Sequence, residues 1–176
     1  METADEKAQA KKKVDEVKTF PVPYDLVSSN KNIINTNKFL FESSKEEIIN
    51  KALRSHSKGN INEALKYYKY SIEKGFNDYR IFSNYADILK QFGKLSEAEK
   101  LLRKAVKIIP NRANLHCDLG NTLRDLGKLK EAELSQRKAI KIEPKSPYAY
   151  CNLGSILIDL RKSKEAEIPT RKAIEI

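Results

Sequence analysis

The sequence predicts an all-α protein: a solenoid of about four helix–turn–helix hairpins behind a flexible N-terminal tail. The main observation is a recurring heptapeptide, which reads GKLSEAE at 93–99, GKLKEAE at 127–133 and RKSKEAE at 161–167. A weaker copy, GNINEAL, lies at 59–65. The copies are 34 residues apart, a period typical of stacked helical hairpins.

Each copy predicts the turn between two helices. In three copies the first residue is a glycine, which is typical of a helix C-terminus, where the chain turns with positive φ and a residue without Cβ is favoured. The following Glu-Ala predicts the start of a second helix, with an acid near the positive N-terminus and a small side chain facing the partner helix. Upstream of the turn, an i, i+3, i+4, i+7 apolar stripe predicts the first helix; its members are Phe82, Tyr85, Ala86 and Leu89.

Numbering each repeat so that the turn residue is its fifteenth gives repeats 45–78, 79–112, 113–146 and 147–176. The eighth residue is then always small: Ala52, Ala86, Gly120 and Gly154. The twentieth is always alanine: Ala64, Ala98, Ala132 and Ala166. Small residues there allow the two helices of a hairpin to approach closely. The fourth is large: Ile48, Phe82, His116 and Tyr150.

This pattern resembles the tetratricopeptide repeat over residues 45–176, including the closing prolines at Pro110 and Pro144. The resemblance implies a right-handed solenoid whose first helices line a concave, partner-binding face. Asparagines at the sixth position of successive repeats resemble the asparagine ladder in the superhelix of O-linked N-acetylglucosamine transferases. Asn84 and Asn152 match that ladder, whereas Asp118 interrupts it.

The first and last repeats depart from the pattern. Lys51 and Ser55 replace apolar core residues in the first. In the last, Arg161 replaces the turn glycine, which predicts a strained positive φ. Pro169 falls inside the last helix and predicts a kink or a late helix start. No closing proline or capping helix follows, so we expect either a fragment of a longer array or self-association through the uncapped C-terminal repeat.

Residues 1–44 predict a mostly irregular tail. The first 18 residues are rich in charge, and Phe20-Pro21-Val22-Pro23-Tyr24 predicts an extended stretch that is either a linker or a docking segment. Ser44 followed by Glu47 is a capping-box pattern, which predicts that the first stable helix begins there.

The net charge of +10 lies entirely in the repeats, because the seven lysines of residues 1–44 are balanced by seven acids. Part of the charge is periodic, in the dyads Arg103-Lys104, Arg137-Lys138 and Arg171-Lys172. This stripe is either a solvated face or a surface for acidic partners or nucleic acid. Aromatic residues are not interleaved with the dyads, which argues against stacking of nucleic-acid bases.

Catalytic and metal-binding chemistry is not indicated. His56 and His116 have no ligand neighbours at metal-site spacing, and His116 occupies a core position. Cys117 and Cys151 lie one repeat apart, which predicts two free thiols. We expect no enzyme activity and no cofactor. The absence of a secretory signal, of an apolar membrane span and of glycosylation acceptors predicts a cytoplasmic protein without membrane partners.

Polar side chains of the first helices share a side turned away from the core stripe. An amide can both donate to and accept from a peptide backbone, and arginine can hold a carboxylate. The candidate partner-binding residues are Arg80, Asn84, Asp87, Lys90, Asp118, Asn121, Arg124, Tyr148, Asn152 and Ser155.

The interpretation is a scaffold or adaptor that binds a protein or peptide on its concave face. One alternative is the targeting module of a larger glycosyltransferase- or sulfotransferase-like enzyme. Another is nucleic-acid binding through the basic convex stripe.

Overall fold

The computed structural model describes residues 44–176, which belong to one compact unit. This part of the chain contains eight α-helices and no strand. The tail expected at the N-terminus, including its extended stretch at 20–24, lies outside the described residues. Ser44 does cap the first helix as predicted, since its hydroxyl accepts from the Glu47 amide and the Glu47 carboxylate accepts from the Ser44 amide.

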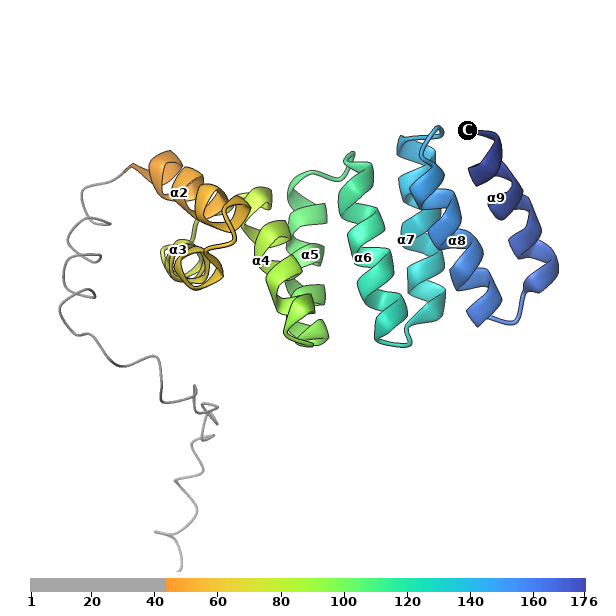
Figure 1. Ribbon diagram of the computed structural model, residues 1–176, viewed down its shortest axis with the longest axis horizontal. Helices are drawn as coiled ribbons and strands as arrows, with labels where there is room; N and C mark the ends of the chain where they lie inside the picture. The colour runs from red at the N-terminus through yellow and green to blue at the C-terminus, as the bar shows by residue number, and fades with distance from the viewer. Residues whose placement is uncertain (1–43) are drawn as a thin grey trace, which may run out of the picture. The chain divides into compact units, whose positions relative to one another are not determined.

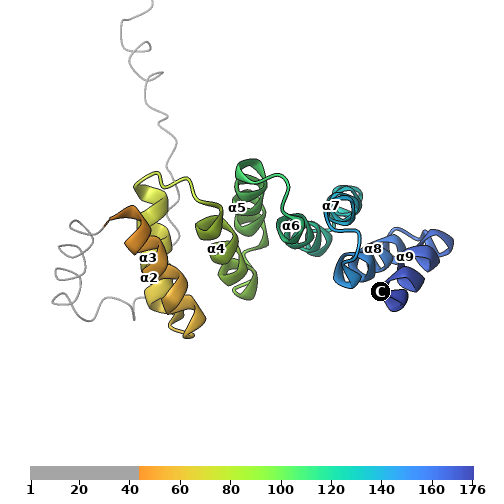
Figure 2. The same ribbon diagram turned by 90° about the horizontal axis from the view of Figure 1, so that it is seen from above.

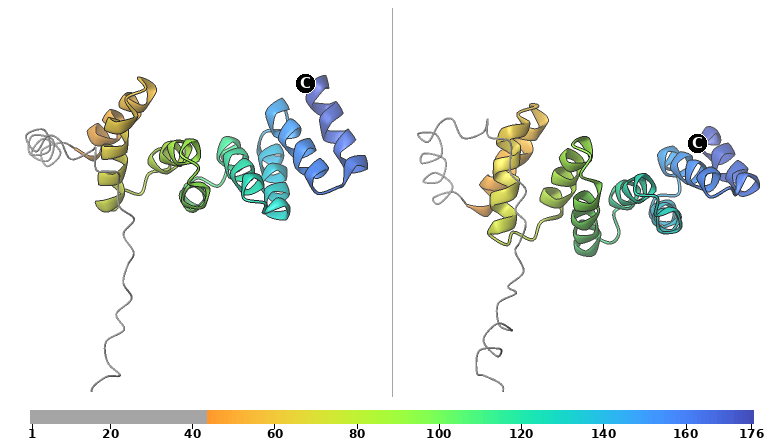
Figure 3. Two further views of the ribbon diagram at one scale, coloured as in Figure 1. Left: turned by 60° about the horizontal axis from the view of Figure 1, so that its bottom comes forward. Right: turned by 90° about the horizontal axis from the view of Figure 1, so that it is seen from below.

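The helices form four hairpins that follow one another along the chain (Figure 1). Figure 2 shows the first helices α4, α6 and α8 in one row, the inner row, with α5 and α7 in a second, outer row. The views in Figure 3 show the same succession of hairpins. The predicted all-α solenoid is confirmed, with the helices α2 (Lys45–Ser57), α3 (Ile61–Glu73), α4 (Tyr79–Gln91), α5 (Leu95–Ile108), α6 (Ala113–Asp125), α7 (Leu129–Ile142), α8 (Pro147–Asp159) and α9 (Ser163–Glu175).

The turns inside the hairpins share one backbone conformation. The turn glycines Gly59, Gly93 and Gly127 have φ of 76°, 71° and 73°. At the turn after α4, the Gly93 amide donates to Lys90 O and the Lys94 amide donates to Leu89 O, at 2.9 and 2.8 Å. These bonds satisfy carbonyls that the end of the helix would leave free. Arg161 adopts the same geometry with φ of 60°, which confirms the predicted positive φ at a residue with a side chain.

Small residues form the contact inside each hairpin. Each alanine at the twentieth position is at most 3 % exposed: Ala64, Ala98, Ala132 and Ala166. In two hairpins the glycine at the eighth position makes room for a polar side chain. A Cβ on Gly120 would lie 2.6 Å from Gln136 Nε2, and a Cβ on Gly154 would lie 2.6 Å from Thr170 Oγ1. The glycines are therefore needed for close approach of the helices.

The first hairpin satisfies its polar core residues internally. Ser55 is buried, and its hydroxyl donates to the Glu63 carboxylate of α3 at 2.9 Å. The hairpin contacts the next one through aromatic rings, because Tyr68 of α3 stacks on Tyr85 of α4 with centroids 5.9 Å apart. A serine therefore replaces the expected apolar residue without leaving a buried hydroxyl unpaired.

The predicted late start of the last helix is wrong. α9 begins at Ser163, the repeat position at which α3, α5 and α7 also begin, and it continues through Pro169 to Glu175. Pro169 is buried in the core side of the helix. The neighbouring Thr170 hydroxyl donates to Ala166 O at 2.8 Å, which ties this turn of the helix together beside the proline.

Ion pairs on the outer row connect successive hairpins. Glu99 of α5 accepts from Arg103 of its own helix and from Lys128 at the next turn, at 2.9 and 2.7 Å. Glu133 repeats this arrangement one hairpin later with Arg137 and Lys162, at 2.8 and 3.2 Å. Burial raises the pKa of Glu99, but the hydrogen bonds from Lys128 and Arg103 outweigh it, so the net shift is downward. The carboxylate therefore stays charged between the hairpins.

The strained turn at Arg161 gives a test of the repeat geometry. Replacing Arg161 with glycine removes a left-handed conformation that costs an L-residue about 1–2 kcal/mol, partly offset by the greater freedom of glycine in the unfolded chain. We expect the free energy of unfolding to rise by about 0.5–1 kcal/mol in urea denaturation followed by circular dichroism. The matched variant Gly127→Arg should lose stability. A loss of stability in Arg161→Gly would contradict the shared turn geometry.

Candidate functional site

The inner row presents a polar network that crosses from one hairpin to the next. The Asn121 amide of α6 donates to the Tyr148 hydroxyl of α8 at 2.8 Å. The Asn121 carbonyl oxygen accepts from Gln136 Nε2 at 3.0 Å, and the same nitrogen lies 3.1 Å from Cys117 O. Gln136 is completely buried in α7. The amide of Asn121 is therefore held in one orientation by a residue that reaches the inner face from behind.

Lys90 and Asp118 form an electrostatic cluster beside this network. Lys90 makes an ion pair with Asp87 at 2.8 Å. Burial lowers the pKa of Lys90, but the hydrogen bond to Asp87 and the charge of Asp118 outweigh it and raise the pKa overall. Burial raises the pKa of Asp118; Lys90 opposes this shift and Asp87 adds to it, and the net shift is upward. Asp118 is thus a half-buried carboxyl group whose charged form is disfavoured by its site.

Both arginines among the candidate residues already hold carboxylates of this chain. Arg124 of α6 donates to Asp159 of α8 at 2.5 Å. Arg80, at the start of α4, donates to both oxygens of Glu46 in α2 at 2.9 Å and to Asp78 at 2.8 Å. A carboxylate of a partner would have to compete with these pairs. The arginines therefore connect neighbouring first helices across the inner row.

Two of the remaining candidates bond within their own helices. The Asn84 amide donates to Arg80 O at 2.8 Å, and the Ser155 hydroxyl donates to Cys151 O at 3.1 Å. Asn152 Nδ2 is shielded from solvent and has no acceptor among the described residues. The structure therefore brings Lys90 close to Asp118 and Asn121 to Tyr148, but it does not connect Asn84 and Asn152 into a ladder.

Two exposed apolar side chains accompany the polar network on α8. Tyr148 and Ile158 are both 57 % exposed. Large apolar or aromatic side chains on a polar surface are the typical anchors of protein interfaces. The inner row thus combines fixed hydrogen-bonding groups with apolar surface in contact with solvent.

Gln136 was missing from the residues proposed from sequence, and the pairing of Asp159 with Arg124 was not predicted. Gln136 has a sequence signal: it belongs to a repeat whose eighth residue is glycine, and the equivalent positions of the preceding repeats hold the buried Tyr68 and Leu102. Asp159 occupies the thirteenth position of its repeat and pairs with Arg124 of the preceding one. Its role depends on the stacking of hairpins, which no local pattern shows.

The histidine and cysteine predictions are confirmed where they concern packing. His116 is 4 % exposed, and its Nε2–H donates to Pro110 O at 2.8 Å. Both cysteines are free, Cys117 buried and Cys151 exposed, and burial raises the pKa of the Cys117 thiol to about 11.

Within residues 44–176, no group of three or more His, Cys, Asp or Glu side chains is placed to hold a metal ion. None of the helices described is long and apolar enough to cross a membrane.

Family comparisons agree with this architecture. One family model, described as TPR repeat, matches residues 120–160, and a second, described as tetratricopeptide repeat, matches residues 79–112 and 147–176. The chain carries tetratricopeptide repeats. No curated protein sequence matches the chain significantly.

Solved structures of MamA share the fold of these tetratricopeptide repeats. A crystal structure of MamA is 18 % identical, with 82 % of each chain covered and a TM-score of 0.72. MamA from Desulfovibrio magneticus RS-1 is 16 % identical, with 76 % of each chain covered and a TM-score of 0.70. MamA MSR-1 is 20 % identical, with the same coverage and a TM-score of 0.67. At these identities the likeness concerns the fold alone.

The environment of Asp118 predicts that replacing it with the neutral asparagine raises the free energy of unfolding by an amount that depends on pH. A raised folded-state pKa means that the carboxyl contributes stability at low pH and loses it as the pH rises through that pKa. Asp118→Asn should therefore be more stable than the wild type at pH 7, and the difference should shrink as the pH falls toward 4. Urea denaturation at both pH values measures this, with the exposed Asp125→Asn as a matched control that should change little. A less stable Asp118→Asn at pH 7 would contradict the assignment.

Proposed function

We propose that the chain is a protein-interaction scaffold that binds an extended segment of a partner protein on the inner row of α4, α6 and α8. The tetratricopeptide repeats and the fold shared with MamA support the general role. The observation that carries the proposal is the network from Gln136 through Asn121 to Tyr148, because it fixes polar groups of two hairpins at a solvent-facing surface.

The electrostatics of the inner row support a site for binding rather than for stability. The half-buried Asp118 carboxylate, with its upward-shifted pKa, costs the fold stability at neutral pH, and such groups are typical of functional surfaces. Carboxylates slightly outnumber cations on these helices, with Asp87, Asp118, Asp125 and Asp159 against Arg80, Lys90 and Arg124. The inner row therefore favours a partner segment that is neutral or basic.

A bound segment would use the exposed groups that the network positions. The Tyr148 hydroxyl accepts from Asn121 and keeps its own proton for a backbone carbonyl of the partner. Its ring, together with Ile158 further along α8, offers apolar surface for partner side chains. Cytoplasmic location remains an expectation from the sequence, and the alternative of a targeting module of a larger transferase gains no specific support from the described residues.

Peptides selected from a phage-displayed library of random 12-residue sequences test this function. Tyr148→Ala should raise the Kd of the selected peptides about tenfold or more, since exposed aromatic anchors contribute more than 1 kcal/mol at such interfaces. Phe92→Ala is the matched control, because Phe92 is 61 % exposed but lies at the turn after α4. Fluorescence anisotropy gives the Kd values. Equal affinity of wild type and Tyr148→Ala would overturn the inner-row assignment.

A further inference from the structure

The outer face of the solenoid carries two equivalent clefts, one where the first hairpin meets the second and one where the second meets the third. The first outer cleft, with a volume of about 670 Å³, is lined by Ile72, Phe82, Ile108, Lys104 and Lys107, together with the loop 75–77. The second outer cleft, of about 510 Å³, is lined by Val106, His116, Ile142, Lys138 and Lys141, together with Pro110 and Asn111. Each residue of the first set lies 34 positions before its counterpart in the second. The repeat thus builds the same cleft twice.

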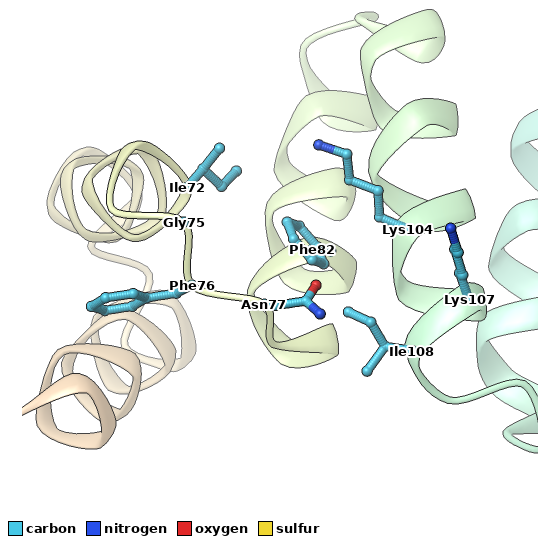
Figure 4. A pocket seen from close by; sticks show the side chains of 8 residues that line it. All are labelled: Ile72, Gly75, Phe76, Asn77, Phe82, Lys104, Lys107 and Ile108. Carbon is cyan, nitrogen blue, oxygen red and sulfur yellow. The ribbon is translucent and has the colours of Figure 1, made fainter.

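Each outer cleft has an apolar floor and a cationic wall. Figure 4 shows Phe82 at the centre of the first cleft, with Lys104 extending from α5 over it toward Ile72 of α3. Lys104 Nζ lies 5.6 Å from the centre of the Phe82 ring. The second cleft continues into a pocket of about 330 Å³ that shares its lysine Lys138 and includes Leu134, a leucine that is 64 % exposed.

The lysines of these clefts are not neutralised by the fold. In the outer dyads it is the arginine that is paired: Arg103 with Glu99, Arg137 with Glu133 and Arg171 with Glu167. Lys104, Lys107, Lys138 and Lys141 are exposed and make no ion pair with any residue of 44–176. In the fourth repeat the lysine at the equivalent position, Lys172, pairs with Glu175 at 3.2 Å. At these repeat positions, two lysines without an ion-pair partner therefore occur together only in the two clefts, among residues 44–176.

The charge of the outer row favours the same kind of ligand. α5 and α7 together carry eight lysines and arginines against four glutamates, whereas α4, α6 and α8 carry three cations against four acids. Opposite faces of one solenoid are thus suited to opposite charges. The outer row is the face on which an anionic partner would be attracted.

We propose that the two outer clefts bind one acidic segment of a partner protein, in which carboxylates alternate with large apolar side chains. Lysine ammonium groups hold the carboxylates, and the apolar side chains cover the partly exposed Ile72 and Val106 and the exposed Leu134. A second, weak cleft at a fixed distance raises the affinity of an extended segment that spans both. Nucleic acid fits less well, because the aromatic Phe82 is only 5 % exposed and leaves no open ring for base stacking. This surface is separate from the inner row and does not depend on its function.

The probe is a fluorescein-labelled peptide of three Asp-Asp-Phe-Gly units, measured by fluorescence anisotropy with the whole chain. The double variant Lys104→Gln/Lys138→Gln should weaken binding about tenfold, because each cleft loses one carboxylate partner. Leu134→Gln should weaken it about threefold, through loss of apolar contact. Neither change should affect folding, since all three side chains are exposed.

The control double variant Lys130→Gln/Lys164→Gln removes the same charge from exposed lysines near the starts of α7 and α9, away from the clefts. It should change the Kd less than about twofold, and Tyr148→Ala should leave this peptide's binding unchanged. Equal loss in the control double variant would mean attraction by bulk charge and would overturn the proposal. Equal binding of a peptide with serine in place of phenylalanine, or tighter binding of an oligothymidylate of the same charge, would overturn it as well.

Discussion

The close contact between the two helices of each hairpin is the constraint on which the structure depends. The second helix of every hairpin buries an alanine that is at most 3 % exposed, and the first helix carries an alanine or glycine at its eighth position. An isolated hairpin of two such helices, each 13 or 14 residues long, would still expose a large apolar side to water. Each hairpin therefore stacks on the next, and the polar sides of its two helices become the inner and outer faces of the array.

The two faces differ because stacking places different pairs of residues side by side. On the inner row, stacking brings Asn121 to Tyr148 and Arg124 to Asp159. On the outer row it brings Glu99 to Lys128. Because Glu99 pairs with Lys128 and with Arg103, Lys104 has no carboxylate partner and stays open to solvent. The same repeat thus produces one face of fixed, nearly neutral polar groups and one face of apolar clefts with free cations.

The sequence predicts the features that recur with the period of 34, such as turns and buried small residues. It does not predict the side-chain contacts that form between helices. The turn at Arg161, the buried Ala132 and the small Gly120 all follow from position within the repeat. The role of Gln136 cannot be predicted without knowing that Gly120 of α6, which has no Cβ, leaves room for its side chain to reach the inner face. The pairing of Arg124 requires knowing which helix lies beside it. The late start predicted from Pro169 was wrong because a general rule for helix interiors was applied where burial and the Thr170 hydroxyl support the helix.

Enlarging the buried alanine of one hairpin tests the central constraint most directly. In Ala132→Leu, added methylenes at a site with no exposed surface must push α6 and α7 apart, which costs about 1–3 kcal/mol. Urea denaturation of this variant beside Leu134→Ala, an exposed position on the same helix, measures the cost. We expect only the first change to lower the free energy of unfolding by this amount. An Ala132→Leu variant as stable as the wild type would show that close packing within the hairpin does not hold the array together.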